Sequence, residues 1–114
     1  MGVPLRVLIV EDSEIDFLIL TQELRRGGYD PVCKRVDTGE ALSDALDRAS
    51  WDAILIDYTL PRFSGIAALE LIKRKHIALP TIIVSGTIDE ETAVAAMKAG
   101  ACDYIMKNNL PRLI

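Results

Sequence analysis

Four apolar runs of the chain are each followed by polar side chains of types that handle phosphate or metal ions. These side chains belong to the acidic pair Glu11-Asp12, to Asp57, to Ser85 and to Lys107. Carboxylate oxygens are ligands that Mg²⁺ prefers, and a lysine ammonium or a serine hydroxyl can bind phosphoryl oxygens. An aspartate carboxylate can also act as a nucleophile and form an aspartyl phosphate. Together the residue types point to phosphoryl transfer assisted by a divalent ion.

Each of these residues alone also has an ordinary structural explanation. Acidic residues favour a helix N-terminus, so the acidic pair could simply begin a helix that Asp12 or Ser13 caps. Asp57 could form a turn with its own backbone, and Lys107 could extend from the core to the surface. The prediction of a site therefore depends on whether the fold brings these residues together.

Short apolar runs alternate along the chain with segments of helical periodicity. The five runs are 5–10, 31–36, 53–56, 81–84 and 104–106. The first, third and fourth are continuous in Val, Ile and Leu, which is typical of strands buried on both faces of a parallel sheet. Asp37-x-x-Glu40 has the spacing of a capping box before the second helical segment, and Met97 in the fourth is expected in the core. The alternation predicts a doubly wound α/β domain, which binds ligands beyond the carboxyl ends of its strands.

In such a sheet the polar residues at neighbouring strand ends converge, because adjacent strands lie about 4.8 Å apart. Carboxylates at about 4 Å would repel one another by roughly 4 kcal/mol per pair at an effective dielectric constant near 20. Lys107 and a divalent cation would offset this repulsion. An oxygen-only ligand set suits Mg²⁺ rather than Zn²⁺, and the one histidine and two cysteines of the chain are widely separated.

Length and composition exclude several classes of protein. A chain of 114 residues, of which 50% are hydrophobic, suits one packed domain. The net charge of −4 argues against direct binding to nucleic acid or to an anionic membrane. No apolar stretch approaches the roughly 20 residues of a membrane span. Two cysteines are too few for a disulfide framework in a domain of this size. A reducing compartment, the cytoplasm, is therefore expected.

Four segments, in chain order, resemble the receiver domain of two-component response regulators, and the resemblance covers almost the whole chain. They are the acidic pair Glu11-Asp12, the phosphoacceptor-like aspartate and loop at 57–65, the strand with its hydroxyl at 81–86, and the run at 99–107 that carries an aromatic residue and a lysine. The resemblance implies a flavodoxin-like sheet of five parallel strands in the order 2-1-3-4-5. It also implies that residues 1–114 form a receiver domain.

The resemblance implies that Asp57 accepts a phosphoryl group from a phosphohistidine on a histidine kinase or a histidine phosphotransfer domain. It implies Mg²⁺ as the cofactor. The implied ligands are Glu11, Asp12, Asp57 and the backbone carbonyl of Thr59. Such a domain is regulatory rather than an enzyme, although it assists its own phosphorylation and dephosphorylation, and the parent protein could be a hybrid histidine kinase.

Residues in or after the fourth and fifth strands also acquire roles from the resemblance. Ser85, Gly86 and Lys107 would bind the phosphoryl group. Ser85 and Tyr104 would change position together and switch the face around the fourth helix and fifth strand.

The chain departs from the family after Lys107. Receivers usually carry a proline there, after a cis peptide bond, whereas this chain has Asn108. A cis bond before a residue other than proline costs about 2.5–4 kcal/mol, so Lys107–Asn108 is expected to be trans. The few residues that follow cannot make a helix of the usual 11–12 or so residues. We therefore expect a truncated fifth helix, a chain cut short of a longer one, and possible homodimerisation through the exposed face.

Other functions fit the residues less well. A phosphatase of the haloacid dehalogenase kind also uses Asp, Lys and Ser or Thr at strand ends, but Thr59 stands where its second aspartate belongs. A nucleotide- or flavin-binding module would need a glycine-rich phosphate loop, which the chain lacks. A degenerate receiver that acts only as an interaction domain would not need the full set of acidic, hydroxyl and lysine residues.

Overall fold

The computed structural model describes residues 2–57, 65–77, 79–85 and 90–106. Strands and helices alternate along this part of the chain, as the apolar pattern predicts. In chain order they are β1 (Val3–Val10), α1 (Glu14–Arg26), β2 (Tyr29–Val36), α2 (Gly39–Arg48), β3 (Ala53–Asp57), α3 (Gly65–Arg74), β4 (Thr81–Ser85), α4 (Glu90–Lys98) and β5 (Asp103–Met106).

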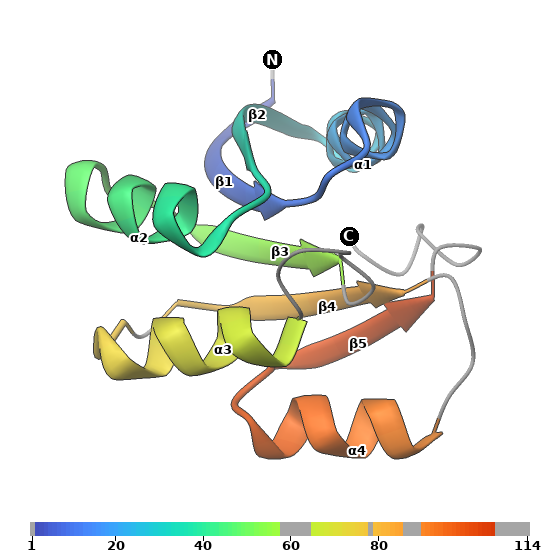
Figure 1. Cartoon of the computed structure of the whole chain (residues 1–114). Coiled ribbons are helices and arrows are strands. Elements are labelled where there is room, and N and C mark those ends of the chain that lie inside the picture. Colours follow the sequence, from blue (N-terminus) through green and yellow to red (C-terminus); the bar gives the residue numbers. More distant parts are fainter. Residues whose placement is uncertain (1, 58–64, 78, 86–89, 107–114) are drawn as a thin grey trace.

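The strands form one parallel sheet in the order β2-β1-β3-β4-β5, which confirms the predicted topology (Figure 1). Helices cover both faces of the sheet. α2, α3 and α4 contribute Leu42, Ala68 and Ala96 to the core on one face. On the other face, Leu20 and Leu24 of α1 pack against the sheet. The last four residues of β1 are fully or almost fully buried, which explains the continuous apolar run in the sequence.

Hydroxyl side chains begin the first two helices. The Ser13 hydroxyl accepts a hydrogen bond from the backbone N–H of Asp16 at the start of α1. At the start of α2, the Thr38 hydroxyl accepts from the N–H of Ala41. The capping box predicted from Asp37 is therefore wrong by one residue, because β2 runs to Val36 and leaves Asp37 outside the capping position.

Trp51 and Met97 differ in how they are buried. Trp51 packs in the core between α2 and β3, and its indole N–H donates to the backbone carbonyl of Ala45 at 3.0 Å. Met97 was expected in the core, but 45% of its surface is exposed. Among the described side chains of α4, Ala96 is the one that is buried in the core, and the neighbouring Met97 points away from it.

The predicted fifth helix and the Lys107–Asn108 bond lie outside the described residues. In the parts of the chain that are described, no helix has both the length and the apolar character that crossing a bilayer requires.

Candidate metal centre

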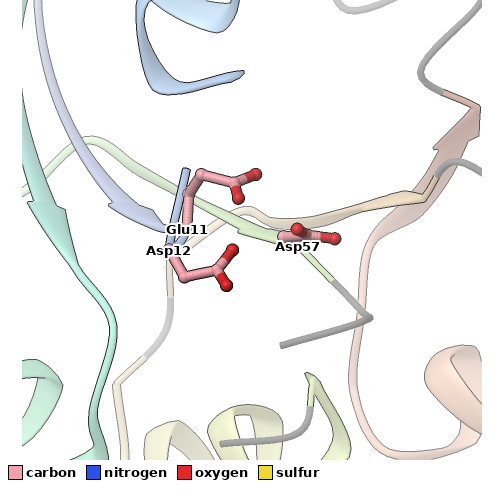
Figure 2. A group of neighbouring side chains, drawn as sticks. All are labelled: Glu11, Asp12 and Asp57. Atoms are coloured by element: carbon pink, nitrogen blue, oxygen red, sulfur yellow. The ribbon is translucent and has the colours of Figure 1, made fainter. Parts of the chain in front are cut away.

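The register of the sheet brings the three predicted acidic residues to one edge. Val10 of β1 lies opposite Ile56 of β3, so Glu11 and Asp57 are the next residues at two neighbouring strand ends. One carboxylate oxygen from each of Glu11, Asp12 and Asp57 can be chosen so that all three lie within 4.8 Å of one another. Figure 2 shows these side chains together, two from the end of β1 and one from the end of β3.

The burial of the three carboxylates differs. Glu11 is fully buried and Asp57 is 5% exposed, whereas Asp12 is exposed to solvent. Two of the three carboxylates are therefore inside the protein, and solvent reaches the cluster at Asp12. Burying like charges this close is unfavourable unless a cation compensates them.

The donor set of the cluster fits a hard divalent cation. All three side chains offer carboxylate oxygens, and neither histidine nor cysteine takes part. Such a set suits Mg²⁺, which takes oxygen ligands and keeps several waters among them, and does not suit structural zinc. The prediction that these three residues could hold one metal ion is consistent with their placement.

Backbone hydrogen bonds fix the position of Glu11. Its N–H donates to the carbonyl of Val36 on β2 at 2.9 Å. One oxygen of its carboxylate accepts from the N–H of Ser13 at 3.1 Å, just before α1. An anion is favoured just before a helix, because the positive end of the helix dipole lies there. The strand-to-helix turn after β1 thus both presents the acidic pair and holds it.

Ser85 is also at this edge of the sheet. It is the last residue of β4 and is fully buried. Val84 lies opposite Asp57, so Ser85 continues β4 one residue beyond that pair. The structure thus places Asp57 between the acidic pair on one neighbouring strand and the hydroxyl on the other.

Four predicted site residues are not placed by the structure. Thr59, Gly86 and Lys107 lie outside the described residues, as does the side chain of Tyr104. Their roles stay predictions.

Sequence reasoning missed Arg35, which lies beside the acidic pair. Its guanidinium donates from Nη1 to the backbone carbonyl of Glu11 at 3.3 Å and lies 3.9 Å from a carboxylate oxygen of Asp37. A cation at the carboxyl end of a predicted strand was the available signal. It carried little weight because basic residues are common on exposed edge strands.

The chain matches a family model described as the response regulator receiver domain over residues 7–114. It is 36% identical over 101 residues to the transcriptional regulatory protein ZraR of Salmonella typhimurium, covering 89% of this chain and 22% of that protein. It is 34% identical over 99 residues to the DNA-binding transcriptional regulator NtrC of Klebsiella pneumoniae, covering 87% of this chain and 21% of that protein. The chain thus spans about a fifth of the length of these curated relatives.

A solved structure has the same fold. The crystal structure of FixJ-N superposes with a TM-score of 0.77 at 31% identity, covering 90% of this chain and 81% of the other. This protein therefore has both the sequence match to the family and a sheet whose edge carries the acidic cluster.

Proposed function

The chain belongs to the response regulator receiver domain family, whose members accept a phosphoryl group on an aspartate, and we propose that Asp57 is that aspartate here. The observation that carries the proposal is the placement of Asp57 at a buried strand end, with its carboxylate oxygen within 4.8 Å of those of Glu11 and Asp12. Of the three acids, Asp57 is on the strand between β1 and β4. A phosphoryl group on it would have the acidic pair on one side and Ser85 on the other.

The acidic residues are proposed to bind Mg²⁺. Glu11, Asp12 and Asp57 supply carboxylate oxygens, and the backbone carbonyl of Thr59 is the proposed fourth protein ligand. Bound there, Mg²⁺ would screen the repulsion between the Asp57 carboxylate and the phosphoryl oxygens. The exposure of Asp12 leaves a side from which the ion can enter with its water ligands.

In the proposed reaction, an Asp57 carboxylate oxygen attacks the phosphorus of a phosphohistidine. The new oxygen–phosphorus bond forms as the phosphorus–nitrogen bond breaks, and the departing imidazole keeps the electron pair and takes a proton from water. Ser85, Gly86 and Lys107 bind the transferred phosphoryl oxygens. Dephosphorylation is a separate hydrolysis, in which water attacks the phosphorus, the bond from the Asp57 oxygen to phosphorus breaks, and inorganic phosphate leaves. Asp57 returns to its carboxylate, so the domain assists its own phosphorylation and dephosphorylation without being a conventional enzyme.

Phosphorylation is proposed to change the face formed by α4 and β5. Ser85 would hydrogen-bond the phosphoryl group, and Tyr104 on β5 would reorient with it. A charge added at one edge of the sheet would thereby alter a surface that a partner or a second copy of the chain can contact.

The proposed phosphodonor is a histidine kinase or a histidine phosphotransfer domain in the cytoplasm. ZraR and NtrC are transcriptional regulators. This chain aligns with about a fifth of the length of each of them. The expectation that this chain does not contact nucleic acid is therefore kept for residues 1–114 alone. A regulator with a DNA-binding output is favoured over a hybrid kinase as the parent protein.

Labelling with acetyl phosphate and Mg²⁺ tests the proposal, with intact mass as the readout. The wild type should gain one phosphoryl group, Asp57→Asn should gain none, and the control Asp44→Asn, which changes an exposed acid on α2, should label normally. Normal labelling of Asp57→Asn would contradict the proposal. Continuous release of phosphate over many turnovers would instead favour a phosphatase.

A further inference from the structure

Arg35 reaches from the carboxyl end of β2 to the backbone of the acidic pair. Its Nη1 donates to the carbonyl of Glu11 at 3.3 Å, although the two residues are 24 positions apart in the chain. The arginine side chain is 35% exposed, whereas Glu11 is completely buried. A surface cation thus bonds to a buried peptide group at the candidate metal centre.

Arg35 and the adjacent Val36 bond to the two backbone polar groups of Glu11. The N–H of Glu11 donates to the carbonyl of Val36, and its C=O accepts from Arg35. That C=O belongs to the peptide group that joins Glu11 to Asp12. β1 ends at Val10, so Glu11 and Asp12 lie beyond the regular pairing of the strands. The orientation of this peptide helps to set where the exposed Asp12 carboxylate points.

The ion pair of Arg35 with Asp37 does not account for this arrangement. The two charged groups are 3.9 Å apart and both are substantially exposed, so their attraction is weak and screened. The hydrogen bond to the Glu11 carbonyl is the stronger constraint, because its acceptor is buried away from water whereas the Asp37 side chain is half exposed.

We propose that Arg35 is a positioning residue for the metal ligands, which orients the Glu11–Asp12 peptide so that both carboxylates face Asp57. This inference rests on the proposed function. Positioning by Arg35 would strengthen metal binding. Its charge alone would weaken metal binding, because a guanidinium near the site repels a divalent cation. Removal of Arg35 should therefore weaken metal binding if positioning dominates and strengthen it if charge dominates.

Mn²⁺ is a suitable probe because it prefers the same oxygen ligands as Mg²⁺ and its free form can be followed by electron paramagnetic resonance. Arg35→Met should raise the dissociation constant for Mn²⁺ about 10-fold, the size of effect seen when residues that orient metal ligands are removed. Arg35→Lys, which can still donate to the same carbonyl, should recover part of the loss. The control Arg48→Met removes the same charge from an exposed pair on α2 and should bind like the wild type.

A second readout separates positioning from damage to the fold. Urea unfolding should show that Arg35→Met is fully folded without metal and loses no more stability than one hydrogen bond accounts for, and excess Mg²⁺ should restore the rate of labelling by acetyl phosphate. Unchanged or tighter Mn²⁺ binding by Arg35→Met would overturn the inference, as would equal losses in the methionine and lysine variants. A wild type that binds no Mn²⁺ would instead refute the proposed metal site, and the inference with it.

Discussion

Val10 and Ile56 lie opposite each other on the parallel strands β1 and β3, so the residues that follow them meet at one edge of the sheet. This pairing turns an acidic pair and a single aspartate, 45 positions apart from Asp12 to Asp57, into one cluster of carboxylates. Repulsion within the cluster lowers the stability of the fold, and the same carboxylates attract a cation. Both consequences can be measured.

Asp12→Asn should stabilise the protein when metal is absent. Removing one of three neighbouring carboxylates relieves repulsion, and because Asp12 is exposed the gain should be about 1 kcal/mol or less. Added Mg²⁺ should raise the free energy of unfolding of the wild type more than that of the variant, since only the wild type has the full ligand set. Urea unfolding with a chelator and with excess Mg²⁺ measures both effects.

The matched control is Asp30→Asn, which removes an exposed carboxylate from β2 far along the strand from the cluster. It should respond to Mg²⁺ like the wild type. Equal stabilisation of Asp12→Asn and the wild type by Mg²⁺ would mean that Asp12 is not a ligand.

The strands and the acidic edge could be predicted because their signals are local. Continuous apolar runs mark strands that are buried on both faces, and the residue after each run is at a strand end whatever the packing. Asp57 and the acidic pair therefore lie where the apolar pattern places them. The strand order came from the resemblance to receiver domains, because apolar runs carry no information about which strands are neighbours.

Features that depend on packing could not be predicted in the same way. The choice of Thr38 over Asp37 as the helix cap depends on where β2 ends. The exposure of Met97 depends on how narrow a strip of α4 touches the core. The bond from Arg35 to Glu11 joins β2 to the turn after β1, 24 positions away in the chain, and has no local sequence pattern.

Thr38→Ala should destabilise the protein more than Asp37→Ala does. The Thr38 hydroxyl accepts a hydrogen bond from the N–H of Ala41, so its loss should cost about 1 kcal/mol. Within the described parts of the chain, Asp37 makes a long, exposed ion pair with Arg35, and its removal should cost at most a few tenths of a kcal/mol. Urea unfolding of the two variants compares these costs directly. A larger cost for Asp37→Ala would restore the capping box as the better description.

The two cysteine thiols should react at different rates. Burial raises the pKa of the half-buried Cys33 thiol above its ordinary value, although a hydrogen bond with Thr21 and the charge of Arg25 partly oppose this. Cys33 therefore has less thiolate at a given pH than an unperturbed thiol, and it is also less accessible than the exposed Cys102.

A disulfide reagent at mildly alkaline pH measures this difference. Cys33→Ser should keep the fast-reacting thiol and Cys102→Ser the slow one, and the slow reaction should accelerate as the pH rises toward the raised pKa. In denaturant both thiols should react at similar rates, which serves as the control. Faster reaction of Cys33 than of Cys102 in the folded protein would contradict the assignment.

Trp51 should stabilise the fold without affecting phosphorylation. It precedes β3, so it lies at the amino end of the strand whose carboxyl end carries Asp57. Trp51 is 9% exposed, the centroid of its ring lies 5.3 Å from the Arg6 guanidinium carbon, and its indole N–H donates to the carbonyl of Ala45. Trp51→Phe keeps an aromatic ring but loses the hydrogen bond and some packing, so it should lower the free energy of unfolding by about 1–2 kcal/mol.

Arg6→Met separates the contribution of the cation above the ring. It should cost about 1–2 kcal/mol, because Arg6 also donates from Nε to the carbonyl of Ser50. Both variants should take up one phosphoryl group from acetyl phosphate at the wild-type rate when they are folded, since neither change touches the carboxyl ends of the strands. A slower rate in fully folded Trp51→Phe would show that packing at the amino end of β3 is transmitted along the strand to Asp57.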